Sequence, residues 1–204
     1  MIRGGPTSRI DRKESSEKMI MLGECGGPRA LLINGTVGAG KTSVADAIGD
    51  LLARAEIPNA VIDLDWLRRS WPPDAGDRFN LGITLRNLRS VAANYLDAGT
   101  ARLVLAGVVE SRDERRRYRD TLGIDLLVCR LKVDLAVVRE RLIGRHGGEA
   151  ALRSGDPTLM WHLNRSGELD DILEAAGAED CVVPASGGTV VEVAAAVLAA
   201  AGWW

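Results

Sequence analysis

One glycine-rich stretch limits the possible folds of this chain more than any other feature. Gly35-Thr36-Val37-Gly38-Ala39-Gly40-Lys41-Thr42 fits the pattern G-x-x-x-x-G-K-[ST], and Ser43 follows it. A short apolar run at 30–33 precedes the stretch and reads as a buried parallel strand. After the stretch, apolar residues recur at helical spacing: Val44, Ala45, Ala47, Ile48, Leu51 and Leu52. A chance match would not bring this strand and helix with it, so the pattern predicts a phosphate-binding loop (P-loop).

The spacing of the motif follows from the chemistry of a bound triphosphate. Glycines let the backbone turn its N–H groups toward phosphate oxygens, and the helix that starts near Lys41 points its positive end at them. We expect Lys41 to reach the β- and γ-phosphates and the Thr42 hydroxyl to ligate Mg²⁺. The motif thus implies ATP and Mg²⁺, with nucleotide contacts from Gly35, Thr36, Val37, Gly38, Ala39, Gly40, Lys41, Thr42 and Ser43.

The composition is that of an ordinary globular domain. The chain has 204 residues, 46% of them hydrophobic, and a net charge of −2, so nothing predicts a general nucleic-acid or membrane surface. Its three cysteines share no metal-ligand spacing, and no apolar run approaches the roughly 18 residues of a membrane span. The N-terminus lacks a signal-peptide pattern, which favours a cytoplasmic location. A monomer and a homodimer both stay open.

Strands and helices are expected to alternate along most of the chain. Residues 1–28 read as a flexible tail, and 29–204 read as one P-loop domain with a lid around 139–160. The expected strands are 29–34, 60–62 (ending at 63–65), 103–109, 125–131 and 181–183. The expected helices are 41–55, 81–98, 111–121, 135–143 (capped by Asp134), 166–176 (capped by Ser166) and 190–201 (capped by Thr189), with a mobile loop over 144–160. The fold class is therefore α/β, a five-stranded parallel sheet with helices on both faces.

Two acidic residues follow the second expected strand. Ligands of open parallel sheets bind beyond the carboxyl ends of the strands, where Asp63 and Asp65 fall. These carboxylates can ligate Mg²⁺ or orient an acceptor hydroxyl, although one of them can instead cap the next turn. Arg68, Arg78 and Asn80 follow at positions suited to an acceptor. Glu110 after the third strand is a weaker candidate for metal support, and Trp66 and Trp71 belong either to the acceptor site or to the core.

The segment Ile62-Asp63-Leu64-Asp65-Trp66-Leu67-Arg68 resembles the D-x-D-x-x-R motif of adenylyl-sulfate kinases. Asp77-Arg78, the helix end at 96–99 and Arg112-Asp113-Glu114-Arg115 keep that family's order over about 29–145. The resemblance implies a nucleoside-monophosphate-kinase-like fold and ATP-dependent phosphorylation of a small molecule. The chain departs from that family at 106–111, where a Ser-Phe-Ile-Ser-Pro type segment is usual, and its part after 145 is more similar to gluconate kinases and chloramphenicol-type phosphotransferases.

Two arginines precede the glycine-containing part of the expected lid. Arg141 and Arg145 share a face if the helix continues through Arg145, and the pattern resembles the arginine-bearing lid of small P-loop kinases. Cations around the transferring phosphoryl group are what this chemistry needs, so we assign both arginines to catalysis together with Lys41, Asp63 and Asp65. The alternative is a solvated face paired with Glu140 and Glu149.

The sequence therefore favours a small-molecule kinase whose acceptor is unnamed. An antibiotic or nucleotide phosphotransferase of the same fold is an alternative, as is a regulatory ATPase. A switch GTPase is disfavoured because the chain has no N-K-x-D element.

Overall fold

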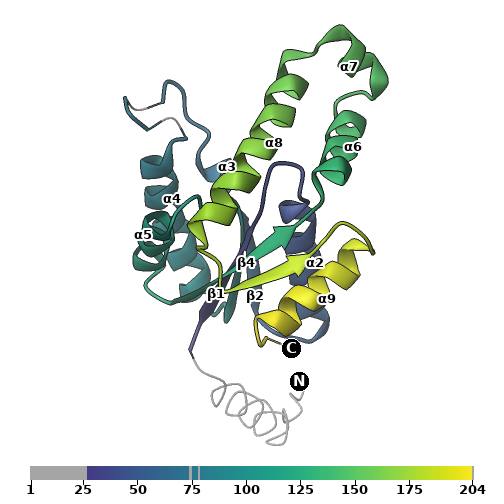
Figure 1. Cartoon of the computed structure of the whole chain (residues 1–204). Coiled ribbons are helices and arrows are strands. Elements are labelled where there is room, and N and C mark those ends of the chain that lie inside the picture. Colours follow the sequence, from purple (N-terminus) through teal and green to yellow (C-terminus); the bar gives the residue numbers. More distant parts are fainter. Residues whose placement is uncertain (1–26, 74, 78, 204) are drawn as a thin grey trace, which may run out of the picture.

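Five parallel strands form the single sheet of the described residues, in the order β2-β3-β1-β4-β5 (Figure 1). The computed structural model describes residues 27–73, 75–77 and 79–203. The strands are β1 Arg29–Asn34, β2 Asn59–Asp63, β3 Arg102–Ala106, β4 Asp125–Lys132 and β5 Cys181–Pro184. The predicted fold class is confirmed. The predicted tail falls almost entirely outside the described residues.

The helices cover both faces of this sheet. They are α2 Lys41–Arg54, α3 Leu64–Leu67, α4 Leu81–Asp97, α5 Arg112–Leu122, α6 Leu135–Arg145, α7 Glu149–Ser154, α8 Pro157–Ala176 and α9 Val190–Ala200. Alternate residues of β1 serve the two sides: Leu31 and Ile33 belong to the core under α2 and α9, and Ala30 and Leu32 to the core under α4 and α5. A strand buried on both faces reads as an unbroken apolar run, which is why β1 was visible in the sequence.

Most of the segment 144–160 is helical, which corrects the predicted loop. α6 runs to Arg145, α7 follows, and α8 begins at Pro157, with the Asp156 carboxylate accepting the N–H of Leu159 at 2.8 Å. Ser166 lies inside α8 and is no N-cap. The buried face of α8 includes Arg165 and Ser166 among its leucines. Because these polar residues interrupt the apolar repeat, the helical period of α8 could not be recognised in the sequence. In Figure 1, α6, α7 and α8 form an arm that projects beyond the sheet.

Smaller differences concern element ends and caps. β3 stops at Ala106, so residues 107–109 are not strand, and Leu64 begins α3 directly after β2. Asp134 occupies the N-cap position of α6 without a capping hydrogen bond from its side chain. Thr189 forms the predicted cap of α9, in a reciprocal pair with Glu192.

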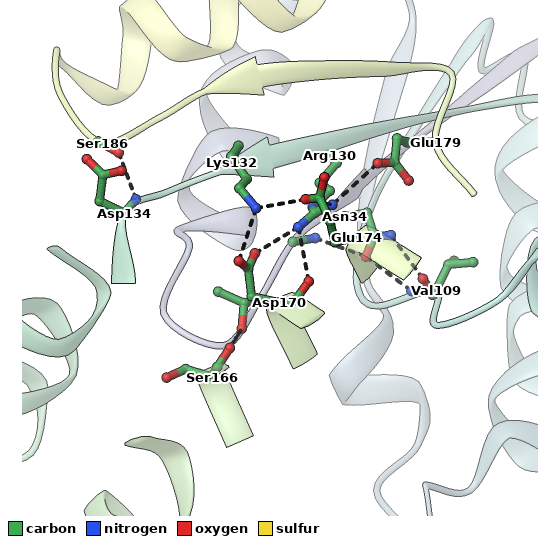
Figure 2. A network of polar contacts seen from close by, with 12 residues as sticks. Asn34, Val109, Arg130, Lys132, Asp134, Ser166, Asp170, Glu174, Glu179 and Ser186 are labelled. Carbon is green, nitrogen blue, oxygen red and sulfur yellow. Dashed lines mark hydrogen bonds and ion pairs between the residues drawn. The ribbon is translucent and has the colours of Figure 1, made fainter. Parts of the chain in front are cut away.

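A buried arginine fastens α8 to the sheet (Figure 2). The Arg130 side chain on β4 is only 2% exposed and forms ion pairs with Asp170 at 2.8 Å, Glu174 at 3.0 Å and Glu179 at 3.5 Å. Lys132, two residues along the same strand, contacts Asp170 at 3.0 Å and Glu174 at 2.9 Å. A buried charge persists only when opposite charges surround it, so these contacts fix where α8 crosses β4.

No helix among the described residues has the length and apolar character needed to cross a membrane.

Gly49 allows α2 to approach β2 closely. A Cβ at Gly49 would lie 2.6 Å from Val61 Cγ2, well inside contact distance. Alanine in a helix interior normally gains about 1 kcal/mol over glycine, but overpacking costs about 1–3 kcal/mol. We therefore expect Gly49→Ala to lower the free energy of unfolding by about 1 kcal/mol, measured by urea denaturation.

Gly144→Ala is the matched control for this prediction. Gly144 lies in α6, and a Cβ added there would meet nothing within 4 Å, so the same change should stabilise by about 0.5–1 kcal/mol. Equal effects at both glycines would contradict the close packing of α2 on β2.

Candidate active site

A cleft of about 710 Å³ opens beyond the carboxyl ends of the strands. Its lining comes from the P-loop after β1, the segments after β2 and β3, the second half of α6, and α8. In a parallel sheet the carboxyl ends of all strands meet at one edge, so chain segments far apart in sequence converge there. The volume lies within the range of ordinary small-molecule sites.

The P-loop has the backbone geometry that phosphate binding requires. Gly35, Gly38 and Gly40 have φ values of 147°, 81° and 92°, a region that side-chain-bearing residues rarely adopt. Asn34 Oδ1 accepts the Gly35 N–H at 2.9 Å, and Asn34 Nδ2 donates to the Val109 carbonyl at 3.0 Å. The start of the loop is thereby tied to the segment that follows β3. Because α2 begins at Lys41, the loop also lies at a helix N-terminus.

Lys41 lies against its own loop. Its Nζ donates to the carbonyl oxygens of Gly35 and Thr36, each at 3.0 Å. Burial lowers the pKa of Lys41 to about 8, although the nearby carboxylates of Asp65 and Asp63 oppose this shift. A partly buried cation gains more from a bound anion than a fully exposed one does.

Asp63 and Thr42 are brought together at the mouth of the loop. Thr42 Oγ1 donates to Asp63 Oδ2 at 2.9 Å, while Asp63 Oδ1 accepts the Asp65 N–H at 2.8 Å as the N-cap of α3. Asp63 therefore has the capping contact that the sequence left as an alternative, and its second oxygen faces the P-loop. Hydroxyl and carboxylate oxygens are the hard ligands that Mg²⁺ prefers.

The donor set fits a magnesium ion held mainly by nucleotide phosphates. The described residues contain no cluster of three or more His, Cys, Asp or Glu side chains that could hold a metal by themselves. Mg²⁺ in phosphate sites is commonly bound through one or two protein oxygens together with phosphates and water. Thr42 and Asp63 can supply those oxygens.

The predicted acceptor residues have different surroundings. Asp65 and Arg68 line the cleft and form an ion pair, with Asp65 Oδ1 3.3 Å from Arg68 Nε. Asn80 Nδ2 donates to the carbonyl oxygens of Arg68 and Ser70 at 3.0 and 3.1 Å, so it holds the turn after α3. Arg78 lies outside the described residues.

Both tryptophans near the acidic pair lie on the surface, which excludes the core alternative. Trp66 is 67% exposed and lines the cleft, whereas Trp71 is 90% exposed and is not among the cleft residues described.

Arg141 and Arg145 both line the cleft, and α6 continues through Arg145. Arg141 donates to the carbonyl oxygens of Ala39 in the P-loop at 3.4 Å and of Ala185 after β5 at 3.0 Å. The contact with Ala39 places Arg141 beside the loop. A Cβ at Gly38 would lie 3.1–3.2 Å from Leu142 and Val138, so α6 packs directly on the P-loop.

Arg165 is a cleft residue that the sequence did not reveal. Its guanidinium pairs with Glu110 and, at 3.0 Å, with Glu168, and its side chain is 8% exposed. One residue later, the Ser166 carbonyl accepts the Thr36 hydroxyl at 2.5 Å, which joins α8 to the P-loop. Glu110 and Arg165 are 55 residues apart in the chain. No local sequence pattern around Glu110 or Arg165 predicts that the two side chains meet.

The two histidines are neighbours in space. Their ring centroids are 4.9 Å apart, and the His162 ring also meets Trp161 edge-on. Burial, together with His146 and Arg145, lowers the pKa of His162. His162 lines the cleft near Arg145.

The depressed pKa of Lys41 gives a test of its charge. Only the ammonium form of Lys41 attracts phosphate, so ATP affinity should fall as the pH rises from about 7 through about 8. Binding above that pH should take up a proton, which calorimetry in buffers of different ionisation enthalpy measures. In Lys41→Arg the cation stays charged, and the fall should vanish. Parallel profiles for the two proteins would contradict the assignment.

Comparison with known proteins supports a kinase-like fold. No protein-family model matches the chain. The bifunctional enzyme CysN/CysC of Rhodopirellula baltica is 34% identical over 119 residues, which is 56% of this chain. The match spans 18% of that curated relative's length.

Solved structures match over nearly the whole fold. The Deinococcus radiodurans tunicamycin resistance protein has a TM-score of 0.60 at 19% identity, with 87% of this chain and 97% of that chain covered. The Mycobacterium tuberculosis APS kinase CysC, solved with AMPPNP and APS, has a TM-score of 0.57 at 22% identity, with 86% and 98% covered. An Acinetobacter baumannii shikimate kinase has a TM-score of 0.53 at 17% identity, with 84% and 91% covered. The cleft therefore belongs to a chain with the fold of the P-loop kinases.

Proposed function

We propose that this protein is an ATP-dependent kinase that transfers the γ-phosphoryl group to a hydroxyl of a small acceptor. The observation that carries the proposal is the Thr42–Asp63 contact of 2.9 Å, because it joins the P-loop to the acidic segment after β2 inside one cleft. Donor and acceptor must meet at such a junction for direct transfer.

The chemistry needs positioning and charge more than covalent help. The acceptor oxygen forms a bond to the γ-phosphorus, the bond from that phosphorus to the β–γ bridging oxygen breaks, and ADP leaves. The proton of the hydroxyl passes to Asp63 or Asp65, whose carboxylates lie at the acceptor side of the loop. Thr42 would hold Mg²⁺, together with Asp63 where Asp65 takes the proton, and the metal would neutralise charge at the phosphates.

The remaining cations have distinct tasks. Lys41 holds the β- and γ-phosphates, and the P-loop N–H groups receive their oxygens. Arg141, beside Ala39, and Arg145, one turn further along α6, stabilise the charge that develops during transfer. The region 139–160 acts as the lid that excludes water.

An acceptor screen tests the function. The purified protein is incubated with ATP and Mg²⁺ and with panels of nucleosides, sugar acids and antibiotics, and mass spectrometry detects products heavier by one phosphoryl group. Adenylyl sulfate belongs in the panel because of the resemblance to its kinases. Stimulation of ATP consumption by one acceptor supports the kinase. Hydrolysis that no acceptor changes would instead favour a regulatory ATPase.

The two carboxylates can be separated by amide substitution. We expect Asp63→Asn to lower transfer by about 10²-fold or more, since it removes the negative charge of a metal ligand or base, whereas the amide oxygen can still cap α3. If Asp63 receives the proton, Asp65→Asn should lower transfer less than Asp63→Asn does. If Asp65 receives it, the two variants should lower transfer by a similar factor. Initial rates at saturating acceptor measure this. Unchanged rates in both variants would contradict the acceptor-site assignment.

A further inference from the structure

We propose that His162 is a further phosphate-binding residue, which holds the triphosphate as a protonated imidazolium and so couples ATP binding to the uptake of a proton. The inference rests on the proposed kinase function and deepens it, because it adds a residue of α8 to the donor site and makes the affinity for ATP depend on pH.

His162 lies on the face of α8 that meets the P-loop. It lines the cleft together with Trp161 and Arg165 of the same helix. Four residues after His162, the Ser166 carbonyl accepts the hydroxyl of Thr36 at 2.5 Å. Residues four apart share one face of a helix and are about 6 Å apart along its axis. The imidazole is therefore part of the cleft wall, one helical turn from the contact with the loop that receives phosphate.

The charged groups that act on His162 in this part of the cleft are cationic. Lys41 and Arg145 line the same cleft, and the charge of Arg145 lowers the pKa of both Lys41 and His162. α7 packs against α8, but its Glu149 and Arg153 do not contribute to the pKa of His162, nor does any other carboxylate of the described residues. A triphosphate brings the negative charge that these groups lack.

In the free protein the imidazole of His162 favours its neutral form. Burial lowers its pKa, and the His146 ring and the Arg145 guanidinium act in the same direction. The backbone of Thr158 opposes this shift. A nearby anion stabilises the imidazolium and raises its pKa, so a bound triphosphate favours protonation of His162. The imidazolium can then donate a charge-assisted hydrogen bond to a phosphate oxygen.

Two neighbouring rings hold this imidazole in place. The centroid of the His146 ring, at the end of α6, lies 4.9 Å from that of His162, with the planes tilted by 40°. The indole of Trp161 meets the His162 ring edge-on at 5.1 Å. His146 is not among the cleft residues described, so His162 is the histidine placed to reach a phosphate. A side chain that is already held loses little rotamer freedom when the ligand binds.

The linkage gives the direction of the pH dependence. Between the pKa values of His162 in the free protein and in the complex, the complex binds more protons than the free protein does. The contribution of His162 to ATP affinity should therefore rise as the pH falls through this range and level off on either side. The range lies below the pKa of Lys41, which is about 8.

Proton NMR of the histidines tests the proposal directly. The chain has two, so the ring Cε1–H signal of His162 is assigned by its loss in His162→Gln. Titration from about pH 5 to 8, with and without AMP-PNP and Mg²⁺, measures the pKa of His162 in both states. We expect bound nucleotide to raise this pKa by at least ~1, which corresponds to a ~10-fold coupling between proton and nucleotide. An unchanged or lowered pKa overturns the proposal.

Glutamine at position 162 separates charge from hydrogen bonding. The His162→Gln side chain can still donate a hydrogen bond but cannot become charged. By calorimetry near pH 6, the wild type should bind AMP-PNP about 10-fold more tightly than the variant and take up a proton that the variant does not. Near pH 8 the two affinities should agree within about 3-fold. The titrations of Lys41 and of the nucleotide cancel in this comparison. Equal losses at both pH values would show a purely structural role and overturn the proposal.

His146→Gln is the matched control, because it removes the other histidine and leaves the described cleft lining unchanged. It should keep most of the proton uptake, since burial and Arg145 still act on His162. Uptake that is lost in His146→Gln but persists in His162→Gln would contradict the assignment. Thermal melting checks that each variant is folded, and the titration of the wild type decides the question if one is not.

The result is separable from the kinase proposal. If AMP-PNP binds without a rise in the pKa of His162, the inference ends, while the acceptor screen can still find a phosphorylated product. If every acceptor fails in the screen, the kinase proposal ends, while the titration with bound nucleotide still decides the role of His162.

Discussion

Lys41→Ala is expected to lower phosphoryl transfer by about 10²–10³-fold with little effect on the fold. The Lys41 ammonium lies among loop carbonyls in a site where burial has already lowered its pKa to about 8. Charge is worth most in such a poorly solvated place, and the transferring group carries developing charge that needs a fixed cation. Alanine removes that cation and leaves the P-loop backbone to bind the phosphates alone.

Single-turnover rates with the acceptor found by the screen measure the effect. ATP affinity, determined by calorimetry, should fall less than the rate, because the P-loop N–H groups still bind phosphate in the ground state. Arg116→Ala removes an exposed cation of α5 that is not among the cleft residues described, so it controls for the loss of a positive charge and should leave the rate nearly unchanged. A Lys41→Ala protein with wild-type turnover would refute the proposed donor site.

Arg130→Met should lower the free energy of unfolding by about 3–5 kcal/mol. Methionine fills much of the same space but leaves the carboxylate of Glu179 near β4 without its cation and leaves Asp170 with Lys132 alone. Both carboxylate side chains are largely buried, at 16% and 12% exposure, so water cannot replace the lost contacts fully. Most of the cost therefore comes from the partners left behind.

Urea denaturation of the wild type and of Arg130→Met measures the difference in the free energy of unfolding. Arg116→Ala is the control for the loss of an exposed ion pair. Arg116 pairs with Asp113 at 2.9 Å, but both side chains are more than half exposed, and the loss should stay within about 0.5 kcal/mol. Because Arg130 holds α8 on the sheet and α8 contacts the P-loop through Ser166 and Thr36, Arg130→Met should also lower the affinity for nucleotide. A loss below about 1 kcal/mol would show that the network is better solvated than its burial indicates.

Local sequence patterns predicted most of the strands and helices. The β1 run, the glycine loop and the repeat of α2 are neighbours in sequence, so one window contains the strand, the turn and the helix. The alternation of strands and helices was sufficient for the parallel sheet, and Thr189 marked the start of α9. α8 was predicted only in its second half, because Arg165 and Ser166 stand where its apolar repeat would continue.

The candidate site divides in the same way. The sequence by itself was enough to predict the P-loop, Lys41, Thr42 and the acidic pair as site residues, since each prediction depends on spacing within a few residues or on the rule that strand ends meet at one edge. Only the tertiary structure decided that Asp63 contacts Thr42, that Asn80 holds a turn, and that Arg165 meets Glu110. Contacts between residues far apart in the chain depend on how helices pack over the sheet, and no local pattern encodes that packing.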